Sequence, residues 1–364
     1  MKSDVNDWAL GNAGKILSKE TLNHPGIISK VSRLDVYGNT PEAYLRAYEA
    51  LGIDIINRVP AENAPAPAEF AEKRYHPDKP YSFTSLGVYD TAFRERFEVS
   101  SPEDVYSLDI DSLRYDDLIV PVPHPCSRDD IKFREKLLGG TGMYYPMLYT
   151  TLFMWAVETL GWENFMVAAI TEPQRFTRHF FEPCAEKSRR IVDEIAEASE
   201  NPFIFLHDDL ADANGPVFPL AWYEDCIFPF YKKIFEPAKR RGKKIIFVAD
   251  GNMTVFLPRL VELGVDGIMC ENPATPLESV MEHFGGSGGY IIGGIDTARL
   301  TMSSPDDISL MVQQVYNTTR DCSGFAVSSC GGLHGNIPME NLDAYFDARV
   351  RIGATPANWR NYFD

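Results

Sequence analysis

The sequence predicts an α/β fold: a single (β/α)8 TIM barrel with N-terminal extensions and with loop insertions over the mouth. Five short apolar or β-branched runs recur in the second half of the chain, and polar residues and then a helix-like stretch follow each one. Runs of this kind, alternating with amphipathic helices, are typical of a parallel sheet covered on both faces. The runs are Phe203–Leu206, Lys244–Val248, Gly267–Cys270, Tyr290–Ile292 and Phe325–Ser328.

A length of 364 residues fits one barrel with insertions. We therefore expect one domain over 1–364, in which residues 1–125 form an irregular part with a hairpin and excursions and residues 126–364 form the regular barrel.

The elements expected before the five runs follow from capping, turn and alternation signals. In order they are a helix over Pro41–Leu51 with Thr40 as its N-cap, a strand over Ile53–Ile56, a surface excursion over Arg58–Pro80, a hairpin of Tyr81–Tyr89 and Thr91–Val99, a short helix opening at Ser101-Pro102-Glu103, and a Pro-rich loop over Val120–Pro125. The Gly139–Gly142 turn lacks phosphate-loop spacing and leads into the aromatic segment Met143–Tyr149. Helices over Phe153–Leu160 and from Thr171 to about Ser199 follow.

The composition argues against several functional classes. A formal charge of −17 and a pI near 4.9 disfavour a nucleic-acid surface, which needs a concentrated basic patch. We interpret the basic runs Lys187–Arg190 and Lys239–Lys244 as solvated helices and helix ends. No apolar run is long enough to span a bilayer, and the N-terminus has no signal-like apolar region. We expect a cytoplasmic protein whose six cysteines, with no CxxC pair, are mostly free.

Polar side chains follow each of the five predicted strands. They are His207-Asp208-Asp209, Asp250-Gly251-Asn252, Glu271-Asn272, Asp296 and Cys330. In a (β/α)8 barrel the carboxyl ends of the strands converge on one mouth, where such enzymes carry out their chemistry. His207, Asp209, Asp250, Glu271, Cys330 and His334 can all bind metals, and a set rich in nitrogen and oxygen suits a catalytic zinc.

Structural interpretations of the same residues stay open. Asp250-Gly251-Asn252 equally fits a simple turn, Glu271 can merely solvate its loop, and Asp296 is better explained as the cap of a helix that begins near Thr297. We expect the other five histidines to be structural or exposed: His24, His76, His124, His179 and His283.

Seven further short stretches lie along the chain: Leu160–Glu163, Thr171–Pro173, Pro229–Lys233, Gly251-Asn252, Leu263–Asp266, Gly293–Asp296 and Ile337–Asn341. Together they resemble the uroporphyrinogen decarboxylase superfamily, and within it the corrinoid-dependent methyltransferases of the methylcobalamin and O-demethylase types. The resemblance covers most of the chain from about Thr40 and implies that the whole of 1–364 is one barrel of this superfamily.

Two departures from the family patterns limit what the resemblance implies. The Gln-Ala-Gly-Arg and Phe-Ser-Asp motifs with which the decarboxylases hold their tetrapyrrole are absent. The His-x-Cys pair of the thiolate zinc methyltransferases is replaced by Val248 and Asp250, and their second Cys falls near Gly331. Family members that act on phenyl methyl ethers use a zinc set of carboxylates and histidine, which is closer to the residues present here.

The resemblance implies a methyltransferase that moves a methyl group between a small methylated substrate, such as an aromatic methyl ether, and a corrinoid carried by a partner protein. A leaving group of this kind needs a Lewis acid or a general acid. We predict His207, Asp209 and Glu271 as catalytic residues. The predicted zinc ligands are His207, Asp250, Glu271 and Cys330, and the predicted substrate-binding residues are Tyr144, Tyr145, Tyr149, Asn252, Trp222 and His334.

Two alternatives remain open at this stage. One is a metal-independent decarboxylase, which a pocket containing Arg175, Arg178 or Arg299 would favour because arginines bind carboxylates. The other is a barrel that binds a small ligand without catalysis. We expect no nucleic acid and no membrane as partners, and a homodimer is left open.

Overall fold

Eight parallel strand positions close into a barrel in the computed structural model, which describes residues 2–10, 15–65, 81–85, 87–94, 99–115 and 127–364. One sheet has the order β1-β13-β12-β11-β10-β7-β6. β5 and β6 follow one another along a single strand position and pair with β2 and β7, respectively. The bridge between Lys19 and Ile55 joins β1 to β2 and completes the circle of eight positions. The strands are β1 (Leu17–Ser18), β2 (Ile55–Ile56), β5 (Met143–Tyr144), β6 (Met147–Leu148), β7 (Phe203–His207), β10 (Lys244–Ala249), β11 (Gly267–Cys270), β12 (Tyr290–Asp296) and β13 (Phe325–Cys330).

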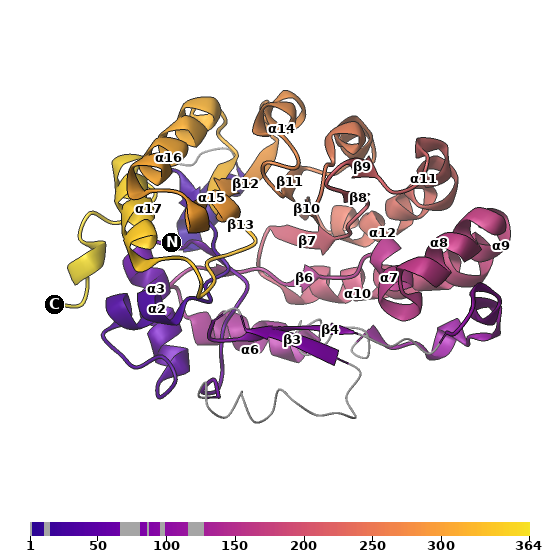
Figure 1. Ribbon diagram of the computed structural model, residues 1–364, viewed down its shortest axis with the longest axis horizontal. Coiled ribbons are helices and arrows are strands. Elements are labelled where there is room, and N and C mark those ends of the chain that lie inside the picture. Colours follow the sequence, from indigo (N-terminus) through magenta and orange to yellow (C-terminus); the bar gives the residue numbers. More distant parts are fainter. Residues whose placement is uncertain (1, 11–14, 66–80, 86, 95–98, 116–126) are drawn as a thin grey trace.

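Helices surround this barrel (Figure 1). They are α2 (Pro25–Ser32), α3 (Thr40–Leu51), α6 (Arg128–Leu138), α7 (Phe153–Leu160), α8 (Trp162–Thr171), α9 (Pro173–Phe176), α10 (Glu182–Ala198), α11 (Leu220–Cys226), α12 (Phe228–Arg240), α13 (Leu257–Glu262), α14 (Leu277–Phe284), α15 (Thr297–Met302), α16 (Pro305–Thr319) and α17 (Met339–Arg351). Within the part of the chain that the structure describes, no helix combines the length and apolar character needed to cross a bilayer.

Alternate residues of each strand point to opposite faces, and this alternation divides the interior into two cores. The outer core lies between the strands and the helices. The inner core fills the barrel with side chains from every strand position, among them Leu17, Ile55, Met143, Tyr145, Phe205, Ile246, Val248, Ile292 and Ala326.

The N-terminal helix α1 (Lys2–Ala9) covers the end of the barrel where the strands begin. The Trp8 ring lies 4.9 Å from that of Phe203 and 4.8 Å from that of Tyr290. The Tyr290 hydroxyl also donates to the carbonyl oxygen of Ala9. Aromatic rings therefore close the interior of the barrel at this end, which favours the carboxyl ends of the strands as the place for a site.

The predicted barrel is confirmed, and each of the five apolar runs is a strand. The predicted hairpin forms from β3 (Tyr81–Ser85) and β4 (Asp90–Arg94), and the short helix η1 (Pro102–Ser107) begins at the predicted proline. The loop Val120–Pro125 and most of the excursion over Arg58–Pro80 lie outside the described residues.

Several boundaries differ from the prediction: the strand expected over Ile53–Ile56 spans Ile55–Ile56, and the first strand of the hairpin is shorter than expected. Thr40 is the first residue of α3 and Asn39 precedes it as the cap, because the Thr40 hydroxyl donates backward to the carbonyl of Val36 instead of accepting from the first turn. The helix expected from Thr171 to about Ser199 is interrupted by a π-helical turn over Thr177–Phe181.

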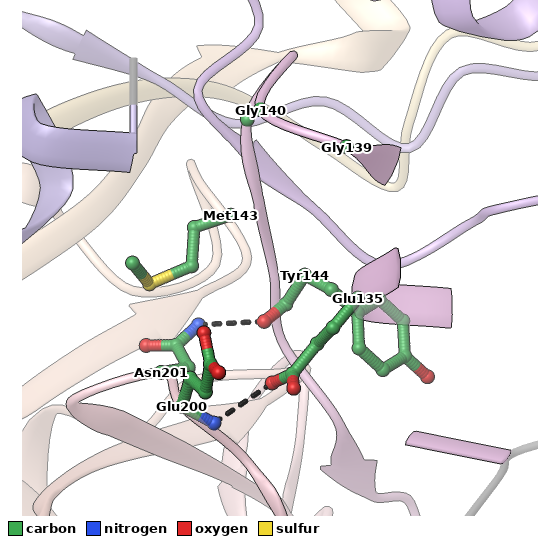
Figure 2. Close-up of a pocket in the computed structure, with 8 residues that line it drawn as sticks. Glu135, Gly139, Gly140, Met143, Tyr144, Glu200 and Asn201 are labelled. Carbon is green, nitrogen blue, oxygen red and sulfur yellow. Dashed lines mark hydrogen bonds between the residues drawn. The ribbon is translucent and has the colours of Figure 1, made fainter. Parts of the chain in front are cut away.

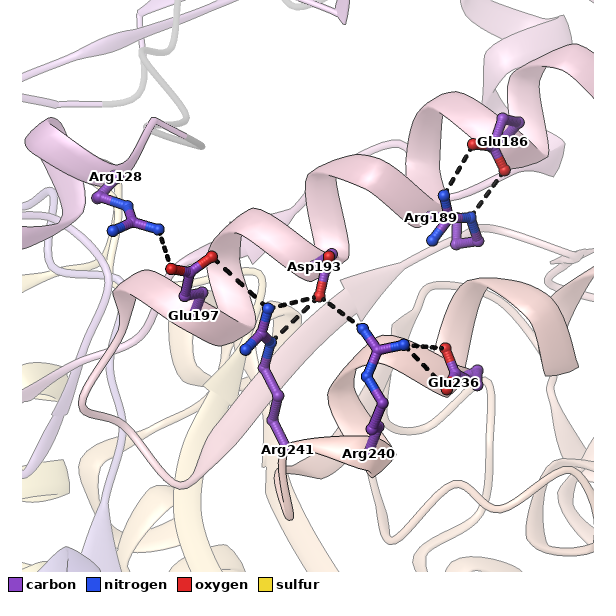
Figure 3. A network of polar contacts seen from close by, with 8 residues as sticks. All are labelled: Arg128, Glu186, Arg189, Asp193, Glu197, Glu236, Arg240 and Arg241. Carbon is purple, nitrogen blue, oxygen red and sulfur yellow. Dashed lines mark hydrogen bonds and ion pairs between the residues drawn. The ribbon is translucent and has the colours of Figure 1, made fainter.

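The two basic runs lie on α10 and at the end of α12, as expected, and carboxylates pair with them (Figure 3). Asp193 accepts from both Arg240 and Arg241, and Glu186 pairs with Arg189. The positive charges of these runs are therefore largely compensated by acidic neighbours on the same helices.

Candidate functional site

The ends of β7 and β10 bring three metal-capable side chains together at the barrel mouth. The side-chain ligand atoms of His207, Asp209 and Asp250 all lie within 4.8 Å of one another. His207 is the last residue of β7 and is almost fully buried, whereas Asp209 is half-buried and Asp250 reaches solvent. The cluster therefore has a buried base and an open side.

The His207 ring is held on both of its nitrogens. Nδ1 lies 2.6 Å from the carbonyl oxygen of Tyr149, and Nε2 lies 3.1 Å from Asp209 Oδ1. The Tyr149 ring also stacks on the imidazole, with centroids 4.4 Å apart and planes inclined by 16°. A carbonyl oxygen can only accept, so Nδ1 carries a proton. This bond directs Nε2 toward the carboxylates, as in histidines that bind metals.

Backbone amides orient the two neighbouring carboxylates. The Asp250 N–H donates to Asp209 Oδ1 over 2.8 Å, and the Gly251 N–H donates to Glu271 Oε2 over 3.1 Å. Gly251 has a φ of +78°, and a Cβ there would lie 2.5 Å from the carbonyl oxygen of Ala211. Only glycine fits this turn, so the tight turn and the acidic site belong to the same loop.

The charges in the cluster depend on one another. Burial lowers the pKa of His207, but the carboxylate of Asp209 outweighs burial and raises this pKa to about 9. Burial raises the pKa of Asp209, and His207 more than reverses this effect. Loss of hydration, followed by repulsion from Asp209, raises the pKa of Asp250 to about 6. At neutral pH the first two residues form an ion pair, and the excess negative charge beside it favours a cation.

Asp208, which lies between the two cluster residues, has a structural role. Its carboxylate accepts from the backbone N–H groups of Leu152, Phe153 and Met154 and from the hydroxyl of Tyr231. It is completely buried. It therefore caps the first turn of α7 and ties this helix to α12.

Of the other predicted metal ligands, Glu271 lies beside Asp250 and raises its pKa. Cys330 is outside the group of mutually close ligand atoms found among the described residues, and its Sγ contacts the carbonyl of Cys270 at 3.4 Å. Burial raises the pKa of the Cys330 thiol to about 11, which keeps it protonated and a poor ligand at neutral pH.

The predicted substrate-binding residues are dispersed. Tyr149 touches His207, but Tyr145 belongs to the inner core and its ring packs at a tilt against Phe205. Trp222 is packed within the aromatic cluster around α7, α8 and α11. His334 lies within 3.5 Å of Thr301 Oγ1, and Asn252 shapes its own turn by accepting from Thr254. Asp296 caps α15, as the alternative interpretation proposed.

Tyr144 lines a separate pocket near the opposite end of the barrel. Figure 2 shows this pocket, where β5 and β7 begin, with Asn201 donating to the Tyr144 carbonyl and the Glu200 amide donating to Glu135. The pocket lies on the far side of the inner core from His207.

Sequence reasoning missed two cations at the mouth, Lys19 and Arg58. Lys19 directly follows β1 and is 2% exposed, and Arg58 follows β2. The sequence offers no clear signal for them, since β1 is only two residues long; the position of Lys19 after a strand of the barrel is what places it at the mouth.

Comparison with known proteins supports the architecture. A family model described as "Uroporphyrinogen decarboxylase (URO-D)" matches residues 150–352, which is more than half of the chain. No curated protein matches. A methyltransferase from Methanosarcina mazei is similar in structure, with a TM-score of 0.65 and 14% sequence identity over 95% of this chain and 97% of that chain.

At this identity the likeness shows the fold alone. A sugar phosphate isomerase/epimerase from Parabacteroides distasonis has a TM-score of 0.42 at 9% identity, over 94% of this chain and 97% of that one, and it adds nothing about function. The match to the family model, over more than half of the residues, shows that this chain belongs to the uroporphyrinogen decarboxylase family.

Proposed function

We propose that the protein is a methyltransferase that moves a methyl group between a small methylated substrate and a corrinoid carried by a partner protein. A divalent cation such as zinc would be held at the mouth by His207, Asp209 and Asp250, with Glu271 beside them. The observation that carries the proposal is the convergence of these three ligand groups within 4.8 Å. The structural likeness to a methyltransferase and the sequence motifs described above favour methyl transfer over the other reactions of the family.

The donor set fits a catalytic zinc site. One imidazole nitrogen and two carboxylates give three ligands of types that zinc accepts, and catalytic zinc sites use three protein ligands with a further position left for water or substrate. The Tyr149 carbonyl keeps the proton on Nδ1 of His207, so Nε2 can exchange its own proton for a cation. When bound, zinc would supply a Lewis acid that stabilises the leaving oxygen or nitrogen of the methyl donor.

The chain's own residues perform the remaining tasks. In the reaction, the bond between the methyl carbon and its heteroatom breaks, and the electron pair stays on the heteroatom. The methyl group would pass to the reduced corrinoid of the partner protein, which would supply the electron pair of the new bond. The Tyr149 ring covers one face of His207 and keeps water from it. Glu271, held by the Gly251 amide, is the residue to which we assign proton exchange with the departing group.

The three arginines that the decarboxylase alternative named, Arg175, Arg178 and Arg299, are all exposed to solvent and do not form a buried carboxylate pocket. Arg175 is also paired with Glu172. A non-catalytic barrel would not need a histidine whose tautomer is set toward two carboxylates.

The test combines cation content with methyl transfer. The zinc-supplied protein is mixed anaerobically with cob(I)alamin and with a panel of methoxylated aromatics, methylamines and methylated thiols. We expect absorbance of methylcobalamin to grow for one donor class. His207→Gln should lose both the bound zinc and the activity.

The matched control is His179→Gln. His179 also bonds a backbone carbonyl, that of Val105, but it lies on the outer helical layer, so this variant should behave as the wild type. A folded protein with bound zinc that yields no methylcobalamin from any donor would overturn the proposal. Full activity of a folded His207→Gln variant would overturn the role of the cluster.

A further inference from the structure

The buried ammonium of Lys19 is not used by the chemistry proposed so far. Lys19 continues β1 through its bridge to Ile55, and its side chain is 2% exposed. Among the described residues, its Nζ donates to one side chain, the Thr21 hydroxyl, over 2.9 Å. An ammonium has three donors, so Lys19 retains donor capacity that the described chain does not use.

Among the described residues, no carboxylate forms an ion pair with Lys19, although the charges of Glu20 and Asp250 act on it from a greater distance. The adjacent Glu20 faces the opposite side of the strand, where Arg349, Tyr345 and Ser329 bind its carboxylate. A buried ammonium without a partner costs free energy that an ordinary structural lysine does not. Burial lowers the pKa of Lys19 to about 8, so the group is still mostly charged at neutral pH.

The barrel places Lys19 across the mouth from the acidic cluster. Around the closed barrel, β10 is four strand positions from β1 in either direction, so the end of β1 faces the end of β10. The electrostatic interaction between Lys19 and Asp250 agrees with this arrangement. The mouth is therefore dipolar, with carboxylates at the ends of β7, β10 and β11 and a cation at the end of β1.

A second cation and an unpaired polar atom follow the end of the neighbouring strand β2. Arg58 donates to Asn23 Oδ1 over 2.8 Å, and its guanidinium lies 4.9 Å from the centre of the Tyr89 ring. The preceding residue, Asn57, has a buried Oδ1 without a hydrogen-bond partner in the described structure. The polar groups of this side are thus concentrated where β1 and β2 end.

We propose that Lys19, with Arg58 beside it, binds the carboxylate of the methyl donor, and that the physiological substrates are small methylated molecules that carry a carboxylate. This inference rests on the proposed methyl transfer and specifies its substrate class. The carboxylate end of the donor lies at β1 and β2, and its methyl-bearing end reaches His207 and Asp250 across the mouth. A neutral donor of the same shape leaves Lys19 unpaired and is selected against.

The test compares acids with their amides. The panel contains 3-methoxybenzoate and 3-methoxybenzamide, together with N,N-dimethylglycine and its amide. Binding is measured by calorimetry with the zinc-loaded protein, and methyl transfer to cob(I)alamin is measured separately. Lys19→Met removes the charge and keeps the length of the side chain, Lys19→Arg keeps the charge, and Lys30→Met is the control because Lys30 forms a surface pair with Asp343.

We expect the wild type to bind at least one of the acids more tightly than its amide. Loss of a charge-assisted hydrogen bond should weaken binding of that acid to Lys19→Met by about 10- to 100-fold, with zinc content and amide binding unchanged. Lys19→Arg should retain most of the preference, and Lys30→Met all of it. A wild type that binds none of the acids, or a Lys19→Met variant that loses acid and amide equally, overturns the inference.

The two proposals fail in different ways. One outcome is acid binding that depends on Lys19, with no methylcobalamin formed from any donor. This result would support the carboxylate site and exclude the methyltransferase proposal. The other outcome is methyl transfer from neutral donors at equal rates in the wild type and in Lys19→Met, with no preference for acids. This result would support the methyltransferase proposal and exclude the carboxylate site.

Discussion

Replacing Lys19 with Met should stabilise the protein at neutral pH, although the change is in the barrel interior. Burial lowers the pKa of Lys19 from 10.5 to about 8. Since one pKa unit corresponds to about 1.4 kcal/mol, the charged form costs the folded state about 3 kcal/mol. The cost is fully present below pH 8, because folded and unfolded chains are both protonated there, and it disappears as the pH rises toward 10.5.

The assay is urea unfolding of wild type and Lys19→Met at pH 7 and at pH 9.5. The free energy of unfolding of the variant should exceed that of the wild type by about 2 to 3 kcal/mol at pH 7, after allowance for the lost bond to Thr21. The difference should shrink at pH 9.5. Other groups titrate in both proteins and cancel in the comparison. A variant that is less stable than the wild type at pH 7, or a difference independent of pH, would refute this reasoning.

Three further predictions concern other parts of the mouth and its supports. Asp208→Ala should lower the free energy of unfolding, measured in urea, by about 3 kcal/mol or more. The reason is that three buried amides and the Tyr231 hydroxyl lose their acceptor. A loss below about 1 kcal/mol would contradict the capping role of Asp208. Arg349→Met should lower the free energy of unfolding by about 3 to 5 kcal/mol in the same assay, since it removes the cation that pairs with the fully buried Glu20. The double variant Arg349→Met, Glu20→Gln should recover part of this loss. Dialysis against a strong chelator should abolish methyl transfer without changing the far-ultraviolet circular dichroism, and added zinc should restore it; activity that survives complete removal of metal would exclude a catalytic cation.

The elements of the second half were predictable because local patterns determine them. The runs at Phe203, Lys244, Gly267, Tyr290 and Phe325 are apolar on both strand faces, and a strand buried between a barrel interior and a helical layer requires that pattern. The helix over Phe153–Leu160 was also predicted with its observed bounds. The first strand was harder to locate, since β1 spans two residues and its apolar run is too short to detect, whereas β2 lies within the strand predicted over Ile53–Ile56.

Within the site, His207, Asp209 and Asp250 were predictable as candidates because they follow strands, but their partners were not. The Tyr149 carbonyl lies 58 residues before the His207 ring that it orients. Asp208 looked like part of the reactive cluster, yet its side chain points away to the start of α7. Neighbours in a strand point to opposite faces, so adjacent aspartates can have unrelated roles.

The sequence by itself determined the barrel class, the carboxyl-terminal strand ends as the place of the site, and the residue types that gather there, because hydrophobic periodicity is a local property of the chain. Only the tertiary structure decided which of those residues meet. Closure of the barrel sets three ligand groups together, leaves Cys330 and His334 outside that group, and brings Lys19 to the opposite side of the mouth from Asp250. Contacts of this kind depend on strand register and on barrel geometry, which link residues far apart in the chain and leave no pattern within it.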